Sequence, residues 1–112
     1  MAQLITRDEV QKKIDNGGVT LVEALPASYY EEAHLPGAVN LPHDQVDGLA
    51  PELLPDKQAE IIVYCANSPC PNSGIAARRL TELGYENVYD YDDGKQDWIA
   101  AGLPTESGSA AF

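Results

Sequence analysis

The sequence predicts an α/β fold, with a small and mostly parallel sheet flanked by helices on both faces. Short segments rich in apolar and β-branched residues alternate along the chain with segments of helical period. This alternation is typical of parallel sheets, because the connection between two parallel strands has to cross a face of the sheet. The 112 residues suit a single domain, 1–112, with about 4–106 forming the fold and 107–112 a tail.

The clearest pattern begins with the run IIVY at residues 61–64, which is typical of a buried strand. From Ser73, a predicted N-cap, apolar residues recur with helical spacing as far as Leu83. Cys65 lies between the two, at the carboxyl end of the strand. Open α/β sheets bind ligands at that edge, so Cys65 is the first candidate for chemistry.

Other strands are predicted at residues 4–5, 19–24, 38–41 and 87–91. Thr6 with Glu9 and Ser28 with Glu31 have the spacing of capping boxes, and each predicts the start of a helix. Residues 43–54 are predicted to be helical with an interruption at 48–51, where glycine and proline occur. A last helix is expected after Gly94 and contains Trp98.

The composition argues against several classes of protein. Seven basic and eighteen acidic residues give a net charge of −11, which disfavours contact with nucleic acid or with an anionic membrane. No apolar run approaches the length of a membrane span. The first residues, MAQLITRDEV, lack the pattern of a secretory signal, so a cytoplasmic location is expected.

The loop from Cys65 to Ser73 contains no cationic side chain. A thiolate needs positive potential around its sulfur, so here that potential must come from backbone amides and from the N-terminus of the following helix. Of the eight residues after Cys65, two are proline, which leaves six amides as possible donors and stiffens the loop.

The candidate substrate-binding residues are those that could offer an amide or a polar side chain to an anion. They are Ala66, Asn67, Ser68, Cys70, Asn72 and Ser73. For the asparagines and Ser68, plain turn formation is an equal alternative. Cys70 is either a resolving cysteine or a small packing residue, and both readings stay open.

Further polar residues are expected to be structural or solvated. Arg78 and Arg79 are assigned to a solvated helix face, and His34 and His43 to structural or surface roles. Two cysteines without histidines at matching spacing make a poor zinc site, so neither a metal nor another cofactor is predicted.

Three segments resemble the single-domain rhodanese family over about residues 4–106. They are YYEEAHLPGAVNLP at 29–42, the strand IIVYC with its loop and Ala-rich helix, and DDGKQDWIAAGLPTE at 92–106. The resemblance places Cys65 on the family's catalytic cysteine. The family commonly has Asp-Val-Arg on an earlier strand, where this chain has Glu23, Ala24 and Leu25.

The resemblance implies a sulfurtransferase. Cys65 would take the sulfane sulfur of a donor anion such as thiosulfate and carry it as a persulfide to cyanide or to a thiol, for example one on a thioredoxin-like protein. Two alternatives are a non-enzymatic binding module and a redox protein that uses a Cys65–Cys70 disulfide. Phosphatase activity is not expected, because the end of the loop lacks the arginine that would clamp an oxyanion.

Overall fold

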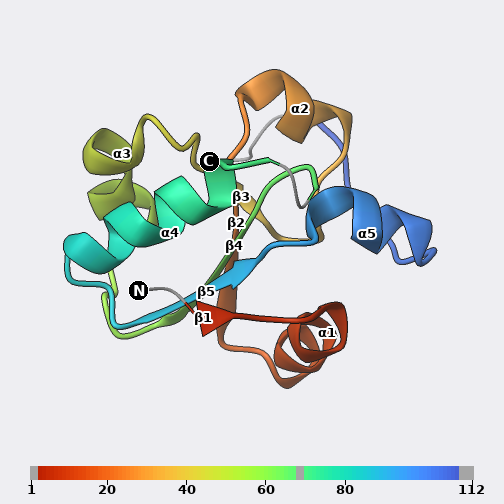
Figure 1. Cartoon of the computed structure of the whole chain (residues 1–112), viewed down its shortest axis with the longest axis horizontal. Coiled ribbons are helices and arrows are strands. Elements are labelled where there is room, and N and C mark those ends of the chain that lie inside the picture. The colour runs from red at the N-terminus through yellow and green to blue at the C-terminus, as the bar shows by residue number, and fades with distance from the viewer. Residues whose placement is uncertain (1–2, 68–69, 109–112) are drawn as a thin grey trace.

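The computed structural model describes residues 3–67 and 70–108, which form an α/β fold (Figure 1). Within these residues the sheet has five strands in the order β1-β5-β4-β2-β3, and every neighbouring pair is parallel. The strands are β1 (Gln3–Leu4), β2 (Val19–Glu23), β3 (Val39–Asn40), β4 (Glu60–Tyr64) and β5 (Asn87–Tyr91). The predicted parallel sheet is confirmed.

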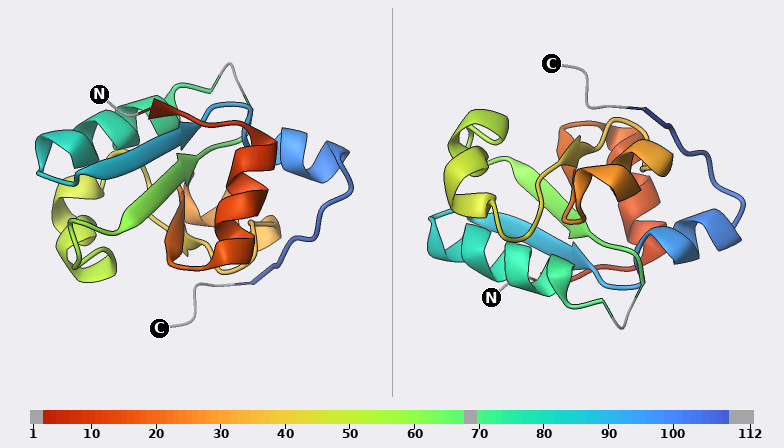
Figure 2. Two further views of the ribbon diagram at one scale, coloured as in Figure 1. Left: turned by 90° about the horizontal axis from the view of Figure 1, so that it is seen from below. Right: turned by 90° about the horizontal axis from the view of Figure 1, so that it is seen from above.

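Helices cover both faces of the sheet, as predicted. They are α1 (Arg7–Asn16), α2 (Ala27–Glu32), α3 (Val46–Leu53), α4 (Asn72–Glu82) and α5 (Gly94–Ala100). Figure 1 views the sheet nearly edge-on, with α3 and α4 on its left and α1 and α5 on its right. The two views of Figure 2 show the same arrangement from below and from above. No helix in the described part of the chain is long and apolar enough to cross a bilayer.

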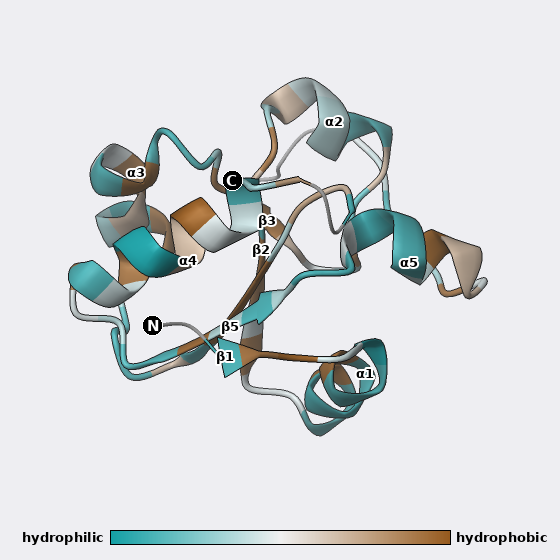
Figure 3. Ribbon diagram, viewed as in Figure 1, coloured by the Kyte–Doolittle hydropathy of each residue, from teal (hydrophilic) through white to brown (hydrophobic). Residues whose placement is uncertain are grey.

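The central strand β4 contributes to two hydrophobic cores. Ile61 and Val63 pack with α3 and α4, whereas Ile62 and Tyr64 pack with α1, α2 and α5. This is the alternation expected of a strand buried on both faces. Figure 3 shows hydrophobic residues along β2 and mainly hydrophilic residues along α1.

The two predicted capping boxes have different outcomes. The Thr6–Glu9 box is present, with both reciprocal hydrogen bonds. The Ser28–Glu31 box is wrong, because α2 begins two residues earlier than a Ser28 cap requires, directly after Pro26, and no side chain caps it. The carbonyl of Pro26 accepts hydrogen bonds from the amides of Tyr29 and Tyr30, so the helix begins where proline has already fixed the backbone.

The predicted interruption of the third helix is also wrong. α3 runs without a break through Gly48 and Pro51. The hydroxyl of Tyr85 donates hydrogen bonds to the carbonyls of Ala50 at 3.2 Å and Leu54 at 2.6 Å, so a tertiary contact supports this turn. Long-range packing here outweighs the helix-breaking tendency of the local sequence.

Candidate active site

Cys65 directly follows β4, at the carboxyl edge of the sheet, and it is fully buried. The alternation of β4 puts residue 65 on the same face as Ile61 and Val63, the face covered by α3 and α4. The loop after Cys65 leads into α4, which packs against β4 and β5. Of the candidate residues in this loop, Ser68 lies outside the described residues.

The start of α5 fixes the first part of the loop. The amide of Lys95 donates to the carbonyl of Cys65 at 2.7 Å, and the amide of Gln96 donates to the carbonyl of Ala66 at 2.8 Å. Gly94 makes this approach possible: its φ is +75°, and a Cβ atom added there would lie 2.6 Å from the carbonyl oxygen of Cys65. The Asp-Gly pair that the sequence marks as a turn is therefore also a support for the cysteine.

The two asparagines of the loop are engaged by the protein itself. The amide of Cys70 donates to the backbone carbonyl of Asn67 at 3.1 Å and to its side-chain oxygen at 3.2 Å. The Asn67 side chain also donates to Gln96 at 3.3 Å. The side chain of Asn72 donates to the carbonyl of Ala24, at the end of β2, at 3.4 Å. Both side chains stabilise the loop, and their contact with a substrate stays a prediction.

The sulfur of Cys65 faces carbonyl groups. Its thiol donates to the carbonyl of Cys70 at 3.4 Å and, more weakly, to that of Asn67 at 3.9 Å. Burial, followed by the adjacent Cys70 side chain, raises the pKa of Cys65 to about 11, against the opposing effect of the Ser73 hydroxyl and amide. Among the described loop residues, Ser73 is the one that lowers this pKa. Fewer amides than predicted therefore stabilise a Cys65 thiolate, and the raised pKa favours the protonated thiol.

Ser73 is not the N-cap of α4. The helix begins at Asn72 with Pro71 before it, and no side chain caps it. Ser73 instead lies inside the first turn and is fully buried beside Cys65. The prediction was wrong because the helix already begins at Asn72, which places Ser73 within the first turn, where its Oγ has no hydrogen-bond partner.

Cys70 is half-buried, and both cysteines are free thiols. The Cys65 thiol donates to the backbone carbonyl of Cys70 at 3.4 Å. The structure thus brings the two residues into contact across the loop. It leaves open whether Cys70 resolves a modified Cys65 or only packs against it.

The sequence analysis missed a buried polar network on the opposite face of the sheet. Lys95 donates to the Glu23 carboxylate at 3.1 Å and to the carbonyls of Tyr29 and Ala33. The hydroxyl of Tyr64 also donates to Glu23, at 2.9 Å. Burial raises the pKa of Glu23, opposed mainly by Lys95. The sequence does contain a signal of this network, because Glu23 is an acidic residue at the end of the otherwise largely apolar strand VTLVE.

The remaining polar residues mostly have structural roles. His34 is buried, stacks on the Tyr30 ring and lies 2.8 Å from the Tyr30 carbonyl. Arg79 pairs with Asp47 on α3 at 2.6 Å and with Glu82 at 3.2 Å, so its charge is engaged at the surface. These contacts confirm the structural reading of His34 and the surface reading of Arg79.

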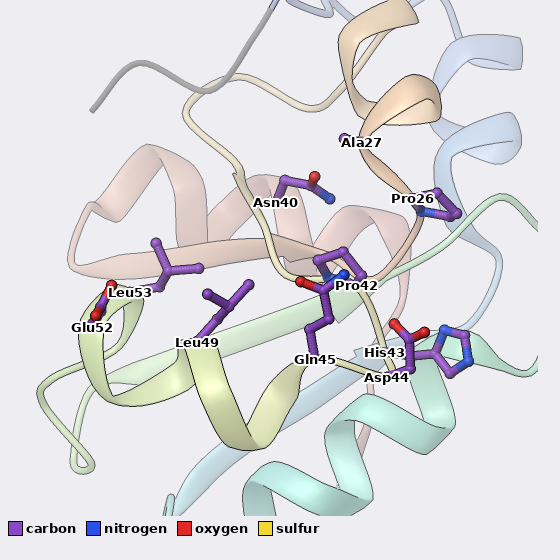
Figure 4. Close-up of a pocket in the computed structure, with 10 residues that line it drawn as sticks. All are labelled: Pro26, Ala27, Asn40, Pro42, His43, Asp44, Gln45, Leu49, Glu52 and Leu53. Carbon is purple, nitrogen blue, oxygen red and sulfur yellow. The ribbon is translucent and has the colours of Figure 1, made fainter.

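A groove of about 610 Å³ lies beside the loop (Figure 4). The amide of His43, which lines the groove, donates to the carbonyl of Ala24, the same carbonyl that accepts from Asn72. Asp44 and Glu52 add carboxylates, and the described lining contains no lysine or arginine. The groove therefore does not favour an anionic ligand.

Known proteins resemble the chain in both sequence and structure. It is 36% identical over 105 residues to the HTH-type transcriptional regulator Rv0324 of Mycobacterium tuberculosis, covering 94% of this chain and 45% of that protein. It is 28% identical to a Bacillus subtilis protein named "Putative sulfur carrier protein YrkF", covering 84% of this chain and 49% of that protein. The chain spans about half the length of these relatives.

Among solved structures, a thiosulfate sulfurtransferase from Pseudomonas aeruginosa matches with a TM-score of 0.83 and 25% identity, over 99% of this chain and 22% of that one. A structure of a rhodanese from E. coli with anions matches with a TM-score of 0.67 and 28% identity, over 80% of this chain and 99% of that one. The rhodanese-like domain family matches residues 6–101. With the parallel sheet and the cysteine after its central strand, this match shows that the chain belongs to the rhodanese-like domain family.

Proposed function

We propose that this protein is a sulfurtransferase that carries sulfane sulfur as a persulfide on Cys65. The main support is the position of Cys65, at the carboxyl edge of the central strand and at the beginning of the loop that leads into α4. The names of two similar proteins, a thiosulfate sulfurtransferase and a sulfur carrier, support the same chemistry. Thiosulfate is the simplest donor to test, and cyanide or a small thiol the simplest acceptor.

The reaction has two displacements. The Cys65 thiolate attacks the outer sulfur of thiosulfate, a new S–S bond forms, and sulfite leaves with the electron pair of the broken bond. An acceptor thiolate then attacks the outer sulfur of the persulfide, and Cys65 leaves as a thiolate. Cys65 must be reduced at the start of each cycle, which a reducing compartment such as the cytoplasm maintains.

The decisive experiment is mass spectrometry of the protein after incubation with thiosulfate. We expect the gain of one sulfur atom on Cys65, which cyanide removes with formation of thiocyanate. Cys65→Ser should abolish both results, because it removes the nucleophile. Cys70→Ser is the matched control, since it makes the same change of sulfur to oxygen five residues further along the same loop, and it should still gain the sulfur.

The proposal fails if Cys65→Ser keeps thiosulfate:cyanide activity while Cys70→Ser loses it. It also fails if the wild-type protein gains no sulfur from thiosulfate or from a persulfide donor such as glutathione persulfide. That second result would favour a binding module built on the same fold.

A further inference from the structure

The backbone around Cys65 is held by two different elements, one on each side of the cysteine. The carbonyl of Tyr64 accepts from the amide of Ala24, directly after β2, at 2.9 Å. The carbonyls of Cys65 and of the next residue accept from the amides of Lys95 and of the residue after it, at 2.7 and 2.8 Å. The position of the cysteine therefore depends on how β2 and the start of α5 lie relative to one another.

A buried ion pair joins these same two elements. Glu23, the last residue of β2, is fully buried, and its Oε2 accepts from Nζ of Lys95 at 3.1 Å. The backbone amide of Lys95 thus holds the Cys65 carbonyl while its side chain holds the residue next to Ala24. Covalent bonds and hydrogen bonds together close a ring that runs through Cys65, Lys95, Glu23, Ala24 and Tyr64.

The charged groups of this ring are fully paired. A lysine ammonium has three N–H donors, and that of Lys95 donates to Glu23 and, at the end of α2, to the carbonyls of Tyr29 at 3.0 Å and Ala33 at 2.7 Å. The other carboxylate oxygen of Glu23 accepts from the hydroxyl of Tyr64 at 2.9 Å. Because each of these donors and acceptors has a partner, the pair has one defined geometry.

Stability alone does not account for a pair of this kind. The cost of removing two charges from water is often as large as their attraction, and apolar residues of similar volume often stabilise a core equally well. Apolar contacts, however, lack the fixed direction and length of hydrogen bonds. The ring is therefore better explained by the placement of Cys65 than by the strength of the core.

We propose that Glu23 and Lys95 are positioning residues for Cys65, because their ion pair fixes β2 relative to α5 and so orients the sulfur toward donor and acceptor. They act through the backbone: Glu23 shares its face of β2 with Leu21, in the core under α1, α2 and α5, whereas the sulfur lies on the other face. A displacement of about 1 Å can slow a reaction on the order of a hundredfold. The proposal deepens the proposed function and rests on it.

The test uses Glu23→Gln combined with Lys95→Met, which removes both charges and leaves no buried ion unpaired. Amide hydrogen exchange of the folded protein, measured by NMR, reports directly on the hydrogen bonds that hold the loop. We expect the amides of residues 95 and 96 to exchange about tenfold faster or more, because the start of α5 is no longer fixed. The amide of Val10, which donates at 2.9 Å in the first turn of α1, should change much less.

Two further measurements follow the cysteine itself. Alkylation of Cys65 by iodoacetamide, measured by mass spectrometry in a Cys70→Ser background, needs no sulfur donor. Since Cys65 is fully buried, alkylation requires the loop to open, and its rate should increase by a factor similar to that of exchange. In thiosulfate:cyanide assays, kcat should fall about tenfold or more while KM stays within about twofold, because orientation rather than donor binding is lost.

The matched control is Glu60→Gln combined with Lys13→Met. Lys13 of α1 pairs at 2.6 Å with Glu60, the first residue of β4, so the same two changes are made at the opposite end of the strand that leads to Cys65. This variant should keep the wild-type exchange at residues 95 and 96, the wild-type alkylation rate and the wild-type kcat.

The proposal is overturned if the folded Glu23→Gln, Lys95→Met protein keeps wild-type exchange at residues 95 and 96. It is also overturned if all amides exchange faster by one common factor, which is the result expected of a pair that only stabilises the fold. Faster exchange with an unchanged kcat would overturn it too. If the wild type transfers no sulfur, the proposed function fails, while exchange and alkylation decide separately whether the pair holds Cys65 in place.

Discussion

At the scale of single residues, the surroundings of Cys65 favour the protonated thiol at rest. The carbonyls of Asn67 and Cys70 accept from the sulfur, and they would repel a thiolate. The pKa of about 11 lies above the ordinary value of 9.0, so the folded protein holds this proton more tightly than the unfolded chain does. The resulting stabilisation is complete below pH 9 and is lost as the pH rises toward 11.

The proximity of the two thiols leads to a prediction about oxidation. A mild oxidant such as diamide should join Cys65 to Cys70, because the Cys65 thiol already contacts the backbone of Cys70 and the loop between them is short. Peptide mapping should recover the linked peptide, and a dithiol reductant should reverse the link. Recovery of only free or singly oxidised cysteines would leave Cys70 with a packing role.

The buried pair of Glu23 and Lys95 leads to a second prediction at this scale. Lys95→Met should reduce the free energy of unfolding by about 3–5 kcal/mol at pH 7, because it leaves the buried Glu23 carboxylate without its partner. Since the pKa of Glu23 is already raised by burial, the variant should be most stable in acid and lose stability from about pH 4.5 upward.

Denaturant titrations at several pH values measure this effect. Adding Glu23→Gln to Lys95→Met should restore part of the loss by removing the unpaired charge. Arg79→Met is the control for loss of an arginine or lysine ion pair at the surface, and its effect should be small. A Lys95→Met protein as stable as the wild type at pH 7 would contradict the account.

At the scale of elements, the strands and the order of helices and strands could be predicted from the spacing of apolar residues and from the positions of glycine and proline. The span predicted for the last strand, 87–91, is the one observed. Helix starts were less predictable: the Thr6 cap has the expected side-chain hydrogen bonds, whereas α2 and α4 begin after Pro26 and Pro71 with no side-chain cap. The same holds for the site, since the cysteine follows from the strand but the groups around its sulfur do not.

The junction between the Cys65 loop and α5 shows how an element controls the site. Gly94→Ala should destabilise the protein by about 1–3 kcal/mol through its positive φ alone, and more through the overlap with the Cys65 carbonyl. The amides of Lys95 and Gln96 would then be displaced from the loop. We expect faster alkylation of Cys65 together with slower sulfur transfer.

Gly48→Ala provides the control for this variant. Gly48 lies within α3, and a Cβ atom added there meets nothing within 4 Å. Alanine should therefore stabilise the protein by roughly 0.5–1 kcal/mol and leave the thiol unchanged. Equal thermal stability and equal alkylation rates in the two variants would show that Gly94 does not support the loop.

At the scale of the whole molecule, charge opposes the approach of an anionic donor. The net charge is −11, and Asp44 and Glu52 line the groove beside the loop. Nearby cations are engaged elsewhere: Lys95 binds Glu23, and Arg79 binds Asp47 and Glu82. Thiosulfate, a dianion, is therefore repelled at long range and attracted only on contact with backbone amides.

Added salt should consequently increase kcat/KM for thiosulfate. The Debye length is about 8 Å at physiological ionic strength, so salt screens the distant carboxylates more than it screens contacts within the loop. Steady-state assays at fixed pH with potassium chloride measure the slope, and the alkylation rate with uncharged iodoacetamide serves as the control, which should stay flat. A marked fall of kcat/KM with salt would mean that a cation does reach the donor. The first variant to test would then be Arg78→Gln, since Arg78 is exposed on α4 and lines a cleft together with Asp90. Removing the responsible cation should restore the positive slope of kcat/KM with salt.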